Sequence, residues 1–363
     1  MKVLDVIIIL AITSILYGCL NKPQKPNIEM DGVVETLHVL TTPEFFEPFS
    51  LYDYHFKNGV LNLIVLTKDH VYKYIGKHAT NKTRLSKKLS NVYSLSLGKE
   101  LGFAINTDSC ILIHDNKWHE FNIIKISQGK IVVNPKSKIL LDQANHRVIF
   151  DGISYSKQDR KRLFDYNHIF SLDYVTGQIK TIQDIRHSEI LINGLKEEPI
   201  TYFHLTDDNR IIISESHDKY IYEIKQNNVQ KYFINNAYDS DLTSKVKNQS
   251  DEIESIKKGI FRFNYLNATV HKNKVIRLFR FQRPEKNNFG HYTSSSMSKI
   301  GLMQCALKSS KSSLLTKLPE NSLFDPNHVT FCSNRLVTTK DIMYDKIHNH
   351  WIFIFSLYRF NGL

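Results

Sequence analysis

The feature that most constrains the fold is a succession of short runs rich in β-branched and aromatic residues, which begins near residue 33 and continues to the C-terminus. Turn-forming stretches with Asn, Asp or Gly separate the runs, a spacing typical of antiparallel strands joined by hairpins. One set is especially regular. Its four predicted strands are 201–205, 210–215, 220–224 and 230–234, with turns at 207–209, 217–219 and 226–228.

Five further sets follow the same rhythm, at intervals of roughly 40 to 55 residues, which is the range of propeller blades. The predicted strands lie at 51–56, 60–66 and 71–75; at 92–97, 101–105, 110–114 and 118–124; at 130–133, 139–142, 147–150, 169–174 and 178–182; at 270–281 with 299–307; and at 329–338 with 351–358. We expect the strand at 33–40 to pair with the C-terminal strand near 352–357, which would close the ring and cover exposed sheet edges.

The segment from Asp208 to Ile224 places an isoleucine run before an alternating Tyr-Ile-Tyr-Glu-Ile strand, and it resembles one propeller blade. The chain after residue 30 resembles the six-bladed propeller lipoproteins of diderm bacteria, with TolB-like or NHL-like blades. The resemblance implies an all-β, six-bladed β-propeller over 31–363. The 14 glycines are few for this fold and leave seven blades open; a pair of β-sandwiches is the runner-up.

One region departs from the strand rhythm. The stretch 239–258 is polar, with apolar residues at near-helical spacing, and Asp251 followed by Glu254 is similar to a capping box. We expect a short helix at 251–258, inserted between blades. A connector packed on the surface is the simpler interpretation, and a lid over the central channel is the alternative.

The N-terminus carries a basic start, an apolar run from Val6 to Tyr17, and Leu16-Tyr17-Gly18-Cys19. Twelve residues at about 1.5 Å each are too short to cross a hydrocarbon core of roughly 30 Å as a helix. The pattern resembles the lipobox of bacterial lipoprotein signal peptides. The resemblance implies a signal peptide at 1–18, cleavage between Gly18 and Cys19, and a lipid on Cys19. The Pro-containing stretch 19–30 would be the tether, and Leu20 favours the outer membrane, facing the periplasm.

The net charge, the cysteines and the aromatic residues limit the classes of partner and the kind of core that we expect. The net charge of +12 favours anionic partners, but no nucleic-acid-binding motif accompanies it, and an exported lipoprotein would rarely meet nucleic acid. After Cys19 the chain has Cys110, Cys305 and Cys332, without a C-x-x-C pair, and we expect buried, unreactive thiols. The 39 Tyr and Phe residues are expected mainly to fill the space between blades, where they would form the core.

Candidate chemistry is sparse. His348 and His350 have a spacing that suits metal ligands, with Asp345 nearby, although two exposed histidines are the simpler interpretation. The segment His114 to Glu120 holds acids and bases but falls in a predicted hairpin, where polar residues are expected. Ser-x-x-Lys tetrads such as Ser96–Lys99 arise by chance in a chain rich in Ser and Lys. We expect no catalytic residue, no resident metal and no cofactor.

The sequence therefore favours a membrane-anchored, non-enzymatic propeller that binds a protein, peptide or glycan. An envelope hydrolase or lyase on the same scaffold and a structural envelope component are the alternatives. Carboxylates or histidines contributed to the channel mouth by three or more blades would favour the enzyme. An aromatic or basic face without such a cluster would favour binding.

Overall fold

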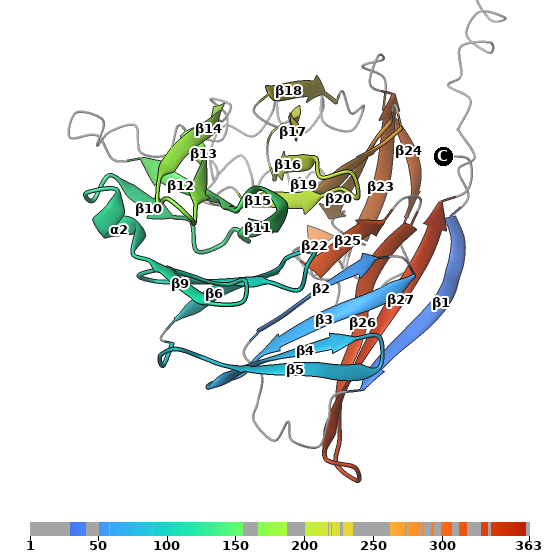
Figure 1. Ribbon diagram of the computed structural model, residues 1–363. Coiled ribbons are helices and arrows are strands. Elements are labelled where there is room, and N and C mark those ends of the chain that lie inside the picture. The colour runs from blue at the N-terminus through green and yellow to red at the C-terminus, as the bar shows by residue number, and fades with distance from the viewer. Residues whose placement is uncertain are drawn as a thin grey trace, which may run out of the picture.

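The computed structural model forms a six-bladed β-propeller, as the sequence predicts (Figure 1). It describes residues 30–40, 51–57, 59–89, 91–154, 166–186, 200–216, 218, 220–225, 228–234, 262–272, 274–282, 285–286, 292–293, 299–306, 312–317, 328–332 and 335–360. The predicted signal peptide, Cys19 and the predicted helix at 251–258 lie outside these residues. No helix within the described part of the chain is long and apolar enough to span a membrane.

Each blade is an antiparallel sheet. In blades 1, 2, 4 and 5 the strands follow one another in sequence from the innermost outward, whereas in blade 3 the first two strands both pair with the third, and blade 6 takes its outermost strand from the N-terminus. Blade 1 contains β2 (Leu51–Lys57), β3 (Val60–Leu66), β4 (His70–Ile75) and β5 (His78–Arg84); blade 2 contains β6 (Val92–Leu97), β7 (Phe103–Thr107), β8 (Ile111–His114) and β9 (Trp118–Phe121); blade 3 contains β10 (Ile131–Val133), β11 (Leu140–Asp142), β12 (Arg147–Ser154), β13 (Tyr166–Asp173) and β14 (Ile179–Arg186).

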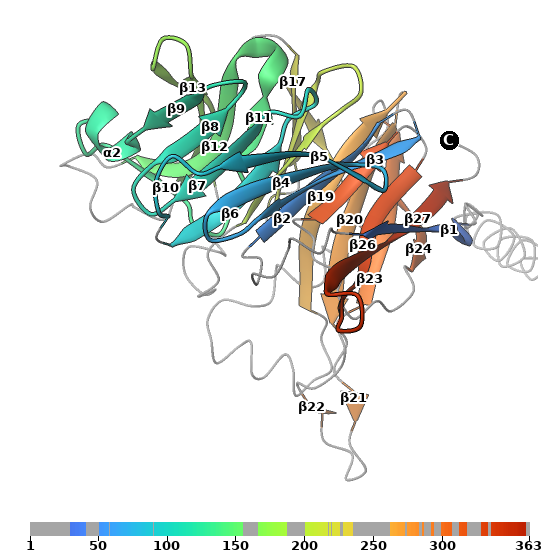
Figure 2. The same ribbon diagram turned by 60° about the horizontal axis from the view of Figure 1, so that its bottom comes forward.

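Blades 4 to 6 repeat the plan. Blade 4 contains β15 (Thr201–Leu205), β16 (Ile211–Glu215), β17 (Tyr220–Lys225) and β18 (Asn228–Phe233); blade 5 contains β19 (Arg262–His271), β20 (Lys274–Gln282), β23 (Lys299–Ala306) and β24 (Ser312–Lys317); blade 6 contains β25 (Val329–Cys332), β26 (Arg335–Asp345), β27 (His350–Phe360) and β1 (Met30–Leu40). A two-stranded sheet of β21 (Glu285–Lys286) and β22 (Tyr292–Thr293) belongs to the connection between β20 and β23 (Figure 2).

The N-terminal strand closes the ring. β1 is the outermost strand of blade 6 and pairs with β27, with Leu40 opposite Ile352 and Glu35 opposite Leu357. The predicted pairing of the two ends is therefore confirmed. Blade 6 is made from both ends of the chain, and this pairing covers the outer edge of β27.

Several local predictions need correction, and one is the run 329–338, which belongs to both β25 and β26. The strand predicted at 118–124 ends at Phe121, because the Asn122 side chain caps a short helix, α2 (Ile123–Ile126), by accepting a hydrogen bond from Lys125 N at 2.9 Å. The run 270–281 contains a turn at Lys272 and belongs to both β19 and β20. The outer strands β5 and β24 were not predicted. A 3₁₀ turn, η1 (Gln143–Asn145), follows β11.

The core lies between neighbouring blades, where the aromatic side chains were expected. Between blades 6 and 1, Tyr52, Tyr54 and Phe56 pack against Phe353 and Phe355. Similar clusters fill the contacts of blade 1 with 2, 2 with 3, 3 with 4, and 4 with 5. Burial of these side chains contributes most of the stability, and it fixes the innermost strands around the channel.

Candidate functional site

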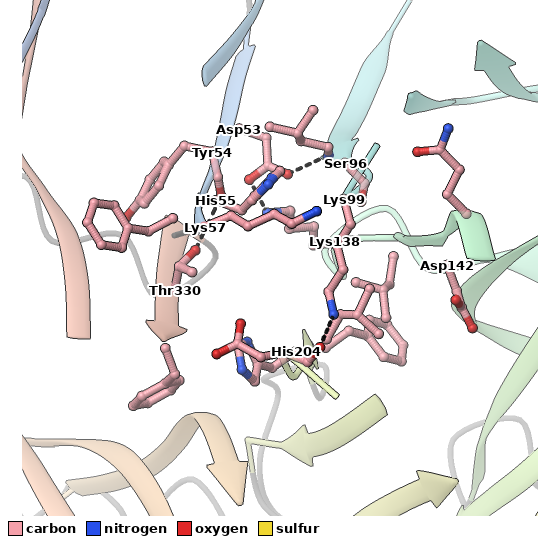
Figure 3. Close-up of a pocket in the computed structure, with 18 of the residues that line it drawn as sticks. Asp53, Tyr54, His55, Lys57, Ser96, Lys99, Lys138, Asp142, His204 and Thr330 are labelled. Carbon is pink, nitrogen blue, oxygen red and sulfur yellow. Dashed lines mark hydrogen bonds and ion pairs between the residues drawn. The ribbon is translucent and has the colours of Figure 1, made fainter. Parts of the chain in front are cut away.

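A cavity of about 420 Å³ occupies the channel at the centre of the ring (Figure 3). Five innermost strands line it: β2, β6, β11, β15 and β25. Its mouth lies where the innermost strands of blades 1 to 4 end, at Lys57, Lys99, Gln143 and Asp207. A cavity of this volume accommodates a small molecule or a few residues of a peptide.

Alternation along β2 explains how polar groups reach the cavity. Tyr52, Tyr54 and Phe56 point into the core shared with blade 6. Successive side chains of a strand point to opposite faces, so Asp53, His55 and Lys57 lie on the other side of β2. This face of β2 places an acid, an imidazole and an amine along one wall of the cavity.

Asp53 connects three blades. Its Oδ2 atom accepts a hydrogen bond from Leu97 N at 2.7 Å, and its Oδ1 atom forms an ion pair with Lys138 Nζ. Only 4% of Asp53 is exposed, so the ion pair and the backbone donor offset the cost of burying its charge. Asp53 is therefore committed to structural contacts between blades 1, 2 and 3.

Lys99 reaches across the channel mouth to blade 4. Its Nζ atom donates hydrogen bonds to Thr206 O at 2.5 Å, Asp207 O at 3.0 Å and Asn209 Oδ1 at 2.8 Å. Burial lowers the pKa of Lys99. All three partners belong to the turn at 206–209, so Lys99 fixes the position of that turn beside the cavity.

Two histidines in the wall are neutral at pH 7. Burial lowers the pKa of His55 to about 4 and that of His204, which lies on β15, to about 3. Lys99 and Lys138 add to the shift at His204 by repulsion. His204 packs edge-on against Phe331 of blade 6, with ring centroids 5.6 Å apart.

His55 has an unused donor. The Asn62 side-chain amide lies 3.1 Å from Nε2 of His55, and Nε2 accepts from it if the proton is on Nδ1. The Nδ1 atom is buried and has no hydrogen-bond partner among the described residues. Buried polar atoms are nearly always paired, so an acceptor from outside the chain would complete this site.

The candidates taken from sequence patterns lie elsewhere, with one exception. Ser96 and Lys99 both line the cavity, but Ser96 Oγ accepts from Leu141 N at 3.0 Å and Lys99 bonds to the turn at 206–209. His119 Nε2 lies 3.0 Å from Asp115 Oδ1 at the outer edge of blade 2. His348 and His350 meet Asp345 at the end of blade 6 opposite the channel mouth.

The thiols differ from expectation at one position. Cys110, Cys305 and Cys332 form no disulfide, and the first two are buried. Cys332 is only half-buried, with Sγ 3.9 Å from Asp207 Oδ2 at the cavity mouth. The prediction of a buried thiol is wrong at Cys332, because it ends β25 beside the opening.

Sequence reasoning missed the residues that form the cavity: Asp53, His55, Lys138 and His204. A signal was present in the printed sequence. Asp53, His55 and Lys57 alternate with aromatic residues in Tyr-Asp-Tyr-His-Phe-Lys, and His204 interrupts Thr-Tyr-Phe-His-Leu. Polar residues inside an otherwise apolar innermost strand are expected to face the channel, since the core would reject them.

The start of β1 lies at the same end of the propeller as the cavity mouth. Cys332 of β25 pairs with Arg335 of β26, Arg335 pairs with Arg359 of β27, and Arg359 pairs with Asp31 of β1. Three strand spacings of about 4.8 Å separate β25 from β1. The chain therefore enters the propeller about 14 Å from a strand that lines the cavity.

The fold and channel define the chain as a six-bladed β-propeller. It is similar to the crystal structure of a member of the DUF4221 family from Bacteroides vulgatus, with a TM-score of 0.57 and 11% identity over 94% of this chain and 100% of that one. It also resembles virginiamycin B lyase from Staphylococcus aureus, with a TM-score of 0.40 and 11% identity over 88% and 98% of the two chains.

A likeness at this identity shows the fold alone. No family model matches the sequence, and no curated protein matches it. The function must be argued from the cavity and its residues.

Proposed function

We propose that this chain is a membrane-tethered, non-enzymatic propeller that binds a short peptide segment, free or as a loop of a partner protein, in the mouth of its channel. The observation that carries the proposal is the Nδ1 atom of His55, which is buried, has no hydrogen-bond partner among the described residues, and is a donor when Nε2 accepts from Asn62. A peptide carbonyl oxygen entering the cavity would accept that hydrogen bond.

The charges of the mouth support a peptide. Lys57 and Asp207 are both exposed there, so opposite charges border one opening. A peptide carries donors, acceptors and, at its ends, both signs of charge. Phe203 of blade 4 and Phe331 of blade 6 are apolar residues of the same lining. Sites for small ligands combine apolar walls with a few fixed polar atoms in this way.

The enzyme alternative is favoured by one observation. Blades 1 to 4 each contribute a carboxylate or a histidine to the lining, which meets the criterion for a catalytic cluster. The pKa values of the histidines and the contacts of the carboxylates support binding over catalysis. A general base works best with a pKa near the working pH, whereas those of His55 and His204 are about 4 and 3. Asp53 is held by Leu97 and Lys138, and Asp142 by Arg147 at 2.8 Å.

The test is a thermal-shift screen of the full-length chain in detergent against a pool of tripeptides and tetrapeptides. We expect peptides that raise the melting temperature of the wild type, and loss of this shift in His55→Phe, which keeps the ring but removes the donor. His114→Phe is the matched control, because His114 Nδ1 is also buried without a partner among the described residues but lies outside the channel. Equal peptide shifts in wild type and His55→Phe would contradict the proposal.

The proposed tether gives the cavity an orientation. If Cys19 carries a lipid, residues 19–29 separate it from β1 and reach at most about 40 Å when extended. The cavity mouth lies at the same end as the start of β1, so it would face the membrane across this gap. By resemblance to lipoproteins with Leu at the position of Leu20, this membrane would be the outer membrane, with the propeller in the periplasm.

A further inference from the structure

The hairpin between β26 and β27 brings three metal-ligand side chains together at its tip. Asp345 is the last residue of β26, His348 lies in the turn, and His350 is the first residue of β27. Asp345 Oδ2 lies 2.8 Å from His348 Nδ1 and 3.8 Å from His350 Nε2. One ligand atom from each residue lies within 4.8 Å of the other two, and no other group of three or more such residues occurs in the described chain.

We propose that Asp345, His348 and His350 bind one zinc ion, with the fourth tetrahedral position left to water. Zinc bonds to imidazole nitrogen and carboxylate oxygen are about 2.0–2.2 Å long, which places ligand atoms about 3.3–3.5 Å apart around a tetrahedral ion. The separations in the hairpin fall on both sides of this value. Small side-chain rotations would bring the three atoms onto one ion.

The hairpin holds the carboxylate in the orientation that zinc needs. Ile347 N and His348 N donate to Asp345 Oδ1 at 2.9 and 3.2 Å, which leaves Oδ2 toward the two imidazoles. Such outer hydrogen bonds orient metal-binding carboxylates. Asn349 takes φ of 54° in the turn, and its side chain accepts a hydrogen bond from Tyr344 OH at 3.2 Å. The backbone of the tip is therefore held by Asp345 Oδ1 and by the Tyr344–Asn349 contact, and neither uses Asp345 Oδ2 or an imidazole nitrogen.

Two of the three proposed ligand side chains are largely buried, and the third is exposed. The side chains of His350 and Asp345 are 14% and 23% exposed, whereas His348 is 69% exposed. His348 can turn toward an ion already bound by its neighbours. Two imidazoles and one carboxylate favour zinc over magnesium or calcium, which prefer oxygen ligands.

The site is separate from the channel cavity. The hairpin lies at the end of blade 6 opposite the cavity mouth, and in Figure 1 it projects below the neighbouring blade 1. A zinc ion there would be far from the proposed peptide and at the end of the molecule opposite the start of β1. Failure of the zinc proposal would therefore leave the proposed peptide site untouched.

Isothermal titration of the full-length chain with zinc chloride tests the proposal. We expect the wild type to bind one ion at the hairpin, and His348→Ala and His350→Ala to bind it about tenfold more weakly or worse. His168→Ala is the control, because His168 forms a similar pair with Asp184, at 2.7 Å, outside any group of three ligands. His348 is exposed enough that its removal should not disturb folding, which thermal unfolding without metal checks.

Cobalt gives a second readout that excludes the cysteines. Co²⁺ bound to nitrogen and oxygen shows visible d–d absorption without the thiolate charge-transfer band that a cysteine site would add. We expect such absorption in the wild type and His168→Ala and its loss in His348→Ala. Zinc affinity that is unchanged in both histidine variants, or no zinc binding by the wild type, would overturn the proposal.

Discussion

At the scale of single residues, His204 couples the channel wall to pH. The native state holds its imidazole neutral, with a pKa of about 3, whereas the unfolded chain takes up a proton near the ordinary value of 6.5. The unfolded state therefore binds more protons below pH 6.5, and the free energy of unfolding falls as the pH is lowered. The limiting slope is about 1.4 kcal/mol per pH unit for one proton.

The variant His204→Gln removes this contribution. Urea unfolding between pH 7.5 and 5 should give a shallower loss of stability toward low pH than in the wild type, with His78→Gln, an exposed position in β5, as the control. Burial raises the pKa of Asp151 to about 6, so between about pH 4 and 6 the native state binds more protons at this residue than the unfolded state does. In that range Asp151 makes the free energy of unfolding rise as the pH is lowered, which is the opposite of the effect of His204. The contribution of Asp151 is the same in the wild type and in His204→Gln, so it cancels when the two pH profiles are subtracted. If the free energy of unfolding depended on pH equally in the wild type and in His204→Gln, a native His204 that stays neutral would be ruled out.

Single residues also mark the limit of prediction from sequence. Asp53 and Lys138 are distant in the sequence, and the arrangement of the innermost strands around the channel brings the two side chains together. No spacing rule predicts such a pair. By contrast, His348 and His350 lie within one hairpin with Asp345, so their proximity was visible in the sequence, although His348 belongs to the turn and not to a strand.

At the scale of elements, the closing strand should matter more than an ordinary outer strand. A double substitution Thr36→Pro with Leu37→Pro in β1 removes at least one donor of the ladder with β27, since neighbouring residues point their N–H groups to opposite sides. We expect a loss of about 3 kcal/mol or more, because the ring also opens.

The control is a pair of adjacent proline substitutions in an outer strand that does not close the ring. Lys82→Pro with Thr83→Pro alters β5, which pairs only with β4 at the edge of blade 1. Differential scanning calorimetry should show a larger fall in melting temperature for the β1 variant. An equal fall for both would show that ring closure adds no stability.

The strands that stand out most clearly in the sequence are inner ones with a buried, apolar interior. β7 and β16 are buried along their whole length, and hydrophobic runs revealed them. β5 reads His-Ala-Thr-Asn-Lys-Thr-Arg and is almost wholly exposed, so it lacks a hydrophobic pattern. The predicted strand 118–124 took in the first two residues of α2, because a short apolar run such as Ile-Ile-Lys-Ile suits both periods and tertiary packing decides between them.

Turn chemistry explains why few glycines did not exclude a propeller. Eight non-glycine residues adopt positive φ in the described chain, against four glycines. Asn91, Asn116, Asn209 and Asn349 are among the eight, and asparagine tolerates this conformation better than most residues. The turns therefore use asparagine in many places where glycine was expected.

At the scale of the whole molecule, the proposed anchor predicts where the protein is found. Cys19→Ala should release the chain from the membrane fraction into the soluble envelope fraction, since no acyl group can be attached. Fractionation followed by immunoblotting measures this, with Cys110→Ala as the control for loss of a buried thiol. Retention of Cys19→Ala in the membrane would contradict the lipid anchor.

The central claim is that the channel mouth is the ligand site, and Cys332 reports on it most directly. Its half-buried thiol lies beside Asp207 at the opening, whereas Cys110 and Cys305 are buried. The decisive measurement is the rate of maleimide labelling at Cys332, mapped by mass spectrometry, with and without a peptide that raises the melting temperature. Peptide bound at the mouth should slow the labelling of Cys332. An unchanged rate with a bound, stabilising peptide would place the ligand elsewhere and contradict the claim.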